Sequence, residues 1–125
     1  MSLRSPLARV RHLGSAKDGT QHFWMQRVSA VALVPLSLWF VVGVIAHLGA
    51  DAGQMKAWMA SPVSAALMIA FVAATYYHGQ LGLQVVIEDY VHDEGLKLAG
   101  VIAVKLGSAI LALATIVAVL RLALA

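Results

Sequence analysis

The sequence predicts an all-α membrane protein in which three apolar segments each cross the bilayer as a helix. Of its 125 residues, 61% are hydrophobic and 12% are charged, and the mean hydropathy is +0.83. A water-soluble domain of this size has too high a surface-to-volume ratio to keep so much apolar surface from water. No apolar segment alternates with period two, which argues against membrane-spanning strands.

Three long segments have the length and composition of spans. Residues 28–50 and 57–87 contain no charged side chain, and residues 98–120 contain only Lys105. A helix needs roughly 20 apolar residues to cross the hydrocarbon core. Pro62 fits the first turn of the second helix, where an amide hydrogen is not needed. We place the predicted spans at about 27–49, 62–88 and 97–122.

Positive charge is concentrated before the first span, and this predicts the orientation. Five lysines and arginines precede that span against a single acid, whereas each loop and the C-terminal tail has one basic side chain. The positive-inside rule therefore puts the N-terminus in the cytoplasm, or in the matrix of a mitochondrion, and the C-terminus outside. We expect residues 1–24 to be a retained basic cytoplasmic segment rather than a cleaved transit peptide. Residues 25–125 then form the three-helix transmembrane domain.

One histidine, His78, lies deep in a predicted span. It is eleven residues from the cytoplasmic end, roughly 16 Å at helical rise and near the bilayer centre. An ionisable group at this depth is a candidate functional residue. The ring either coordinates a haem iron through one nitrogen or makes a structural hydrogen bond to another helix. Gly79 and Gly82 leave the neighbouring helix surface without bulk, and a second axial ligand would have to come from another subunit.

The other ionisable residues of interest have simpler expected surroundings. His12 and His92 are expected in solvent and His22 at the membrane interface. His47 is expected to extend from the outer end of the first span toward the interface rather than to bind metal. Lys105 either extends toward the cytoplasmic surface or pairs with a haem propionate or a partner's acid. The pattern leaves both interpretations of Lys105 open.

An acid and a tyrosine, Asp89 and Tyr90, stand where the second span reaches the predicted cytoplasmic surface. Asp89 follows His78 by eleven positions, about three helical turns, so the two lie on nearly the same face. The pair fits a helix end with an interfacial tyrosine. It equally fits a quinone site, in which the phenol donates to a quinone carbonyl and the carboxylate orients it or relays a proton.

The pattern His-x3-Gly-x6-Asp-Tyr, at His78, Gly82, Asp89 and Tyr90, resembles the small hydrophobic membrane anchor of succinate dehydrogenase (respiratory complex II), more narrowly the anchor of the D type. Residues 14–36 also resemble that family's entry into its first helix. The resemblance extends over nearly the whole chain, including the three-span layout and the cytoplasmic N-terminus.

The resemblance implies a role for each matching residue. His78 matches an axial ligand of the haem b iron, with the opposite ligand supplied by a companion cytochrome b anchor subunit. Tyr90 matches a tyrosine that binds the ubiquinone carbonyl, and Asp89 matches the adjacent acid. Arg27 matches an arginine near the haem propionates, a pairing that opposite charge favours.

The resemblance also implies two soluble partners, an iron–sulfur subunit and a flavoprotein subunit. They would dock at the bacterial inner membrane, or at the mitochondrial inner membrane in a eukaryote. This chain has no cysteine and ligates no cluster through thiolates, so it is a non-flavin subunit without a complete active site. Electrons from succinate, a substrate of the tricarboxylic acid cycle, would pass to quinone in the respiratory chain. Membrane lipid is an expected contact, and nucleic acid is not, because topology explains the basic segment.

Two other classes stay open. One is a fumarate reductase-type cytochrome b anchor, which has the same architecture and runs the reaction in reverse. The other is a small non-redox transporter or assembly protein, in which His78 and Asp89 would relay protons.

Overall fold

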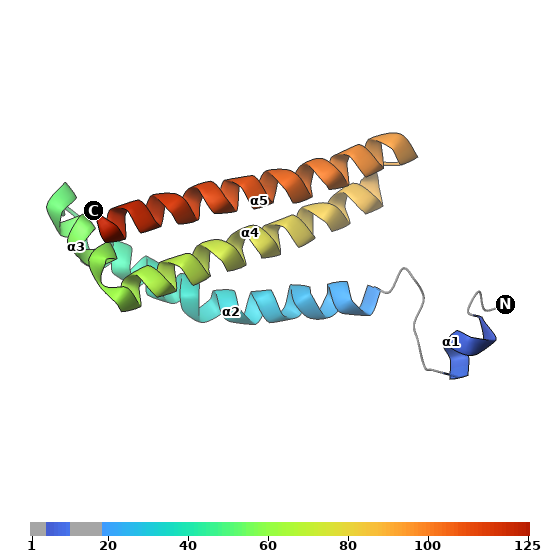
Figure 1. Ribbon diagram of the computed structural model, residues 1–125, viewed down its shortest axis with the longest axis horizontal. Coiled ribbons are helices and arrows are strands. Elements are labelled where there is room, and N and C mark those ends of the chain that lie inside the picture. The colour runs from blue at the N-terminus through green and yellow to red at the C-terminus, as the bar shows by residue number, and fades with distance from the viewer. Residues whose placement is uncertain (1–4, 11–18) are drawn as a thin grey trace.

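The computed structural model describes residues 5–10 and 19–125, which are helical and contain no strand. The three longest helices lie lengthwise beside one another, and a short helix crosses one end of the bundle (Figure 1). The all-α class predicted from the sequence is confirmed. The predictions for His12 and for half of the basic N-terminal segment of residues 1–24 fall outside the described residues. In chain order the helices are α1 (Pro6–Val10), α2 (Gly19–Ala46), α3 (Ala52–Ala60), α4 (Pro62–Tyr90) and α5 (Glu94–Leu124).

Two helices are long and apolar enough by themselves to cross a membrane. They are α2, with 28 residues, and α5, with 31 residues. The helix α4, with 29 residues, is a candidate span only when it is taken together with α3. The two helices meet at a bend of 89°. A 28-residue helix is about 42 Å long, which exceeds the hydrocarbon core of about 30 Å. The described chain thus holds two candidate spans, or three if the bent pair forms one.

The connection between α2 and α4 is itself helical, which was not predicted from the sequence. Gly49, with φ of 79°, takes the left-handed backbone that favours glycine just after α2 ends. Asp51 then caps α3: its carboxylate accepts from the Gln54 amide at 2.8 Å, and the Gln54 side chain accepts from the Asp51 amide at 2.9 Å. Ser61 is extended because it precedes Pro62, and the sharp turn into α4 follows.

A short connection of residues 91–93 joins α4 to α5, so the two helices run antiparallel. The carboxylate of Asp93 accepts a hydrogen bond from the Leu96 amide at 2.8 Å and caps the first turn of α5. Glu94 lies in the first turn and Arg121 in the last, as the helix dipole favours.

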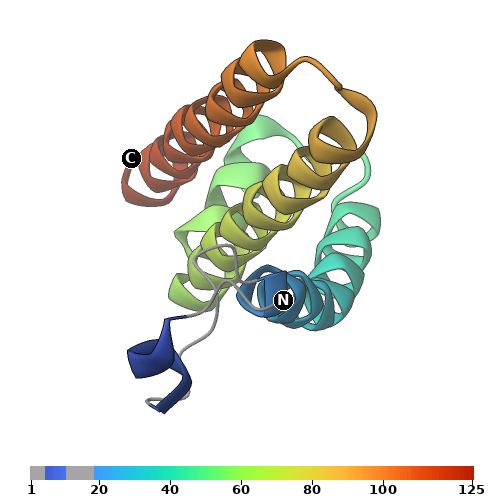
Figure 2. The same ribbon diagram turned by 90° about the vertical axis from the view of Figure 1, so that its right-hand side faces the viewer.

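A proline lies inside α2. Pro35 has no amide hydrogen, so one helical hydrogen bond is missing there and the ring crowds the preceding turn. In Figure 2 α2 bends along its length, as a proline in mid-helix predicts. Neighbouring helices make such a bend tolerable within a membrane.

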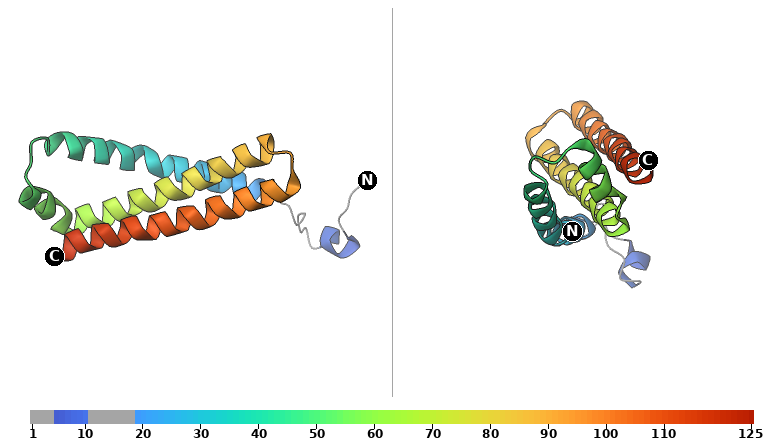
Figure 3. Two further views of the ribbon diagram at one scale, coloured as in Figure 1. Left: turned by 90° about the horizontal axis from the view of Figure 1, so that it is seen from above. Right: turned by 90° about the vertical axis from the view of Figure 1, so that its left-hand side faces the viewer.

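The middle helix of the bundle is α4. It contacts α2 along one side and α5 along another, so that among the described residues α4 lies between α2 and α5 (Figure 2). Phe40 of α2 stacks on Phe71 of α4, with ring centres 4.8 Å apart. On the other side, the hydroxyls of Tyr76 and Thr115 are 3.2 Å apart. The short α3 packs against α4 and α5 at one end of the bundle (Figure 3).

Very little of this chain is buried by its own residues. Among the described apolar side chains only Met59, Val72, Leu81 and Val119 are buried. Large apolar side chains are exposed along all three long helices; Leu38 is 63% and Leu113 is 65% exposed. Such continuous apolar faces need lipid or another protein to cover them.

Candidate functional site

His78 lies where α4 meets α2, and its ring is bonded to a buried serine. The His78 Nδ1 atom is 2.9 Å from Oγ of Ser29, which is only 6% exposed. The Ser29 hydroxyl in turn donates to the carbonyl oxygen of Gln26 at 3.1 Å. A serine hydroxyl has one hydrogen, so its oxygen is left to accept the bond from His78. When the Ser29 hydroxyl donates to Gln26, the ring proton of His78 is on Nδ1 and Nε2 keeps a free lone pair.

The surface beside the imidazole has room for a flat ligand. Apart from its chain neighbours and the helix backbone, a Cβ built on Gly79 would have no atom within 4 Å, so the helix surface at Gly79, about 100° around α4 from His78, is open. A Cβ on Gly82 would come no closer than 3.9 Å to its nearest neighbour, the Gln26 amide nitrogen. In the described part of the chain Nε2 of His78 forms no hydrogen bond. His78 therefore offers a ligand one unpaired ring nitrogen, Nε2, on a ring that Ser29 holds in place.

The acid–tyrosine pair stands apart from His78, at the end of α4. Tyr90 is 77% exposed and Asp89 is also exposed. Twelve residues separate Tyr90 from His78, which is roughly 18 Å along a helix. Neither the Asp89 nor the Tyr90 side chain forms a hydrogen bond within residues 19–125, and it is Asp93 that caps the next helix. The two candidate sites therefore share a helix but not a cavity.

The structure gives Arg27 an aromatic contact on its own helix. Its guanidinium carbon is 4.9 Å from the ring centre of Phe23, one turn earlier in α2. The arginine is exposed and forms no ion pair with any described residue. Arg27, which lies two positions before Ser29 in the sequence, is thus available to bind an anion that belongs to another molecule.

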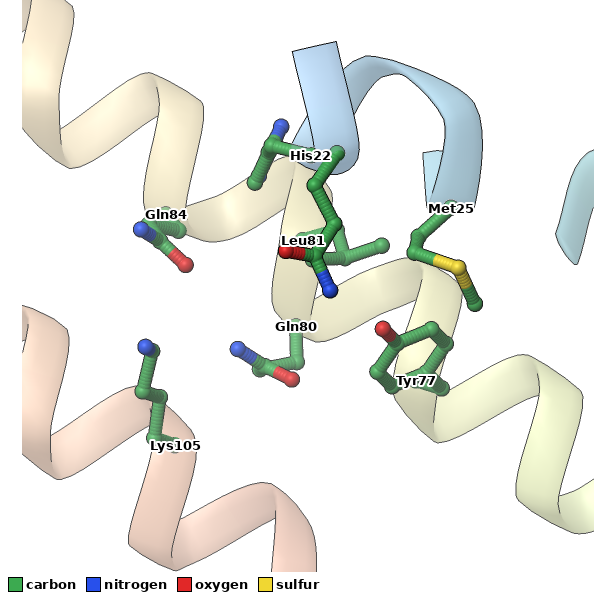
Figure 4. Close-up of a pocket in the computed structure, with 8 residues that line it drawn as sticks. His22, Met25, Tyr77, Gln80, Leu81, Gln84 and Lys105 are labelled. Atoms are coloured by element: carbon green, nitrogen blue, oxygen red, sulfur yellow. The ribbon is translucent and has the colours of Figure 1, made fainter. Parts of the chain in front are cut away.

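A polar cavity of about 400 Å³ opens between α2, α4 and α5 (Figure 4). It was not predicted, although polar side chains recur at Tyr77, Gln80 and Gln84 with helical spacing in an apolar helix. Next to it on α2, the His22 Nε2 and the Gln26 Oε1 atoms are buried without a partner in the described residues. The lining side chains are Gln21, His22, Met25, Tyr77, Gln80, Leu81, Gln84 and Lys105.

His47 has a structural environment at the opposite end of the bundle. Its Nδ1 atom is 2.8 Å from the carbonyl oxygen of Gly43. Its ring stacks on Trp58 of α3, with ring centres 4.4 Å apart and planes 17° apart. A Cβ on Gly43 would overlap the Trp58 ring, so glycine makes room for this contact. No group of three or more metal-ligating side chains occurs within the described residues, His47 included.

The long apolar helices and their exposed apolar faces define a class of protein, the helical integral membrane proteins. Residues 1–120 match the family model described as succinate dehydrogenase/fumarate reductase transmembrane subunit. The chain therefore belongs to this family.

Three similar proteins are each named succinate dehydrogenase hydrophobic membrane anchor subunit. The one from Rickettsia bellii is 36% identical over 116 residues, which are 93% of this chain and 93% of the relative. The one from Paracoccus denitrificans is 34% identical over 110 residues, 88% of this chain and 85% of the relative. The one from Rickettsia conorii is 28% identical over 116 residues, 92% of each. No solved structure matches the chain.

The resemblance noted from His78, Gly82, Asp89 and Tyr90 is confirmed at the level of the family. The chain is a transmembrane subunit of the type found in succinate dehydrogenase, and its apolar helices agree with a membrane location.

Proposed function

We propose that the chain is the membrane anchor of a succinate:quinone oxidoreductase, that it helps to hold haem b, and that it forms part of the quinone reduction site. Its partners are a companion cytochrome b anchor subunit, an iron–sulfur subunit and a flavoprotein subunit. The family match supports the enzyme complex. The observation that supports the finer proposal is the contact between His78 Nδ1 and Ser29, which leaves the other imidazole nitrogen without a partner among the described residues.

The described residues fit a haem. A ligating histidine normally donates its second ring nitrogen to a fixed acceptor, and Ser29 is that acceptor for His78. The open space at Gly79 gives the clearance that a porphyrin needs. His78 Nε2 would bind the iron, and the exposed Arg27 would pair with a propionate. Haem b, when bound, supplies a one-electron redox centre beside the quinone site.

Tyr90 and Asp89 serve the quinone. The exposed Tyr90 phenol donates a hydrogen bond to a ubiquinone carbonyl and so fixes the orientation of the ring. Asp89 orients that phenol and relays a proton, because reduction of a quinone to a quinol takes up two protons with two electrons. The electrons come from clusters in the iron–sulfur subunit, since this chain has no cysteine. The high exposure of both residues is consistent with a pocket that partner subunits complete.

The chain crosses the membrane three times, with α2, α4 and α5 as spans and α3 at the outer surface. This topology puts residues 1–24 in the cytoplasm, as a basic segment before a transmembrane domain of residues 25–125. Tyr90 and the α4–α5 connection then lie on the cytoplasmic side, where the iron–sulfur and flavoprotein subunits bind. The membrane is the bacterial inner membrane, in keeping with the Rickettsia and Paracoccus relatives. The exposed apolar faces supply the surface for the companion anchor.

A fumarate reductase anchor is the second candidate, because the matching family includes both enzymes. The residues of the two sites serve either direction of electron flow. The direction is measured by comparing succinate oxidation with quinone against fumarate reduction with quinol in the same preparation. A non-redox transporter or assembly protein is disfavoured by the family match.

The proposal is tested by purifying the full chain from its own membranes in mild detergent. We expect a flavoprotein and an iron–sulfur protein to copurify, with a reduced haem b spectrum and succinate:quinone reductase activity. A colourless preparation without these partners and without activity would contradict the proposal.

A further inference from the structure

The polar cavity between α2, α4 and α5 holds a positive charge without a counterion. Lys105 extends from α5 toward Gln80 and Gln84 of α4 (Figure 4). The lysine is exposed, and no described residue forms an ion pair or a hydrogen bond with its ammonium group. The cavity lining contains no acid, and Gln21 and Gln80 supply amide donors, while the Gln84 side-chain amide already donates to Oε1 of Glu88 at 2.9 Å. These groups together suit a ligand with a negative charge and several acceptor oxygens.

In the proposed topology the Lys105 side chain comes close to the cytoplasmic boundary of the hydrocarbon core. The 31 residues of α5 are about 46 Å long, so about 8 Å projects beyond each side of a 30 Å core. Lys105 is eleven residues from Glu94, roughly 16 Å along the helix, which puts its Cα about 8 Å below the core boundary. A lysine side chain of roughly 6 Å that extends toward the N-terminus of α5 then brings the ammonium to about 2 Å below that boundary, close to the phosphates of the adjoining headgroups.

The cavity continues into an apolar groove. A second cavity of about 360 Å³ shares Tyr77, Gln80 and Lys105 with the first. Away from the shared residues it runs between α4 and α5, where Ala73 and Ala109 are among the small side chains that line it. The polar end lies toward the α4–α5 connection and the apolar end toward the middle of both helices. A free anion would not need an apolar groove beside its binding site. A phospholipid would, because its acyl chain can lie in that groove.

We propose that this composite groove binds one anionic phospholipid, with Lys105 and the neighbouring glutamines on its phosphate and an acyl chain along Ala73 and Ala109. Basic pockets between transmembrane helices are suited to anionic headgroups because the charge pair is partly shielded from water. The site is separate from His78 and Tyr90 and does not depend on a bound haem or quinone.

The test measures lipid binding to the purified full chain in neutral detergent by native mass spectrometry. Phosphatidylglycerol and phosphatidylcholine with identical acyl chains are titrated in parallel. We expect one phosphatidylglycerol to bind about tenfold more tightly than phosphatidylcholine, and Lys105→Gln to abolish this preference. Lys97→Gln is the matched control, because it removes the same charge from the same helix at a lysine already paired with Glu94 at 3.4 Å. Lys105→Arg should keep the preference, which guards against a folding defect in Lys105→Gln.

The acyl groove is tested separately. Ala109→Leu should weaken phosphatidylglycerol binding several-fold by filling the groove, while Ala103→Leu, an exposed position of α5 outside both cavities, should not. Inorganic phosphate at the same concentration should not displace the lipid.

Three outcomes would overturn the proposal. If Lys105→Gln prefers phosphatidylglycerol over phosphatidylcholine as strongly as the unchanged chain does, Lys105 does not bind the lipid. Displacement by inorganic phosphate would identify a free-anion pocket instead. If Lys105→Gln instead loses a copurifying protein while its lipid preference is unchanged, the lysine pairs with a partner's carboxylate and the lipid assignment is wrong.

Discussion

The two candidate sites on α4 differ in how far this chain builds them by itself. Around His78 the chain supplies a buried hydrogen-bond partner, Ser29, and an uncrowded helix face at Gly79. Around Tyr90 it supplies a phenol that is 77% exposed and no described hydrogen bond to that phenol. The buried group is the Ser29 hydroxyl, and a buried polar group is stable only when its bonds are satisfied, so its contacts with His78 and Gln26 are organised within this chain. The Tyr90 end is left for partners to complete.

The strongest test of this contrast removes the imidazole. We expect His78→Ala to eliminate the reduced haem b absorbance of the purified complex, because no other described histidine lies at this depth with a free nitrogen. The spectrum is recorded as reduced minus oxidised, normalised to flavin content. His92→Ala, an exposed position in the α4–α5 connection, is the control and should keep a normal spectrum. A full haem spectrum in His78→Ala would exclude ligation by this residue.

The second test addresses the exposed end of α4. We expect Tyr90→Phe to lower quinone reductase activity by about 10- to 100-fold, because the phenol hydrogen that orients the quinone is lost. Haem content and subunit composition should not change. Tyr76→Phe is the control: it loses a hydrogen bond to Thr115, costing about 1 kcal/mol in stability, but should leave quinone kinetics as they are. Unchanged kinetics in Tyr90→Phe would take this residue out of the quinone site.

The third test asks whether the buried partner of His78 matters. We expect Ser29→Ala to lower haem affinity about tenfold, because the ring loses the acceptor that fixes its orientation. The measurement is the haem-to-protein ratio during titration with a competing haem-binding protein, together with the haem midpoint potential. Ser29→Thr retains a hydroxyl and should restore both values, and Ser37→Ala, about two turns further along α2, should alter neither. Identical haem affinity in Ser29→Ala and the unchanged complex would show that Ser29 only packs against the ring.

The smallest expected effect belongs to Arg27, which is exposed like Tyr90 but assigned to the haem. We expect Arg27→Gln to lower the haem midpoint potential by about 30–60 mV, because removal of a positive charge near a propionate stabilises the oxidised form. Arg27→Lys should recover most of the shift. A potential unaffected by both substitutions would mean that Arg27 has no propionate partner.

Much of the architecture follows from the sequence. Long runs without charge predict the helices α2, α4 and α5, because a chain this apolar can satisfy its backbone in lipid only by internal hydrogen bonds. The depth of His78 and the position of Tyr90 at a helix end follow from counting residues. The helix α3 was missed, although Asp51 and Gln54 carry the spacing of a capping box.

The tertiary structure decided which side chains contact one another. The bond between His78 and Ser29 joins residues 49 positions apart, and the cavity at Lys105 requires three helices at a particular rotation. The sequence could not supply these contacts, because α4 is apolar on nearly every side and its composition does not say which face turns toward α2 and which toward α5. The sequence alone determined that helices form and how far along its helix each residue lies. Side-chain packing between those helices determined which polar residues became partners.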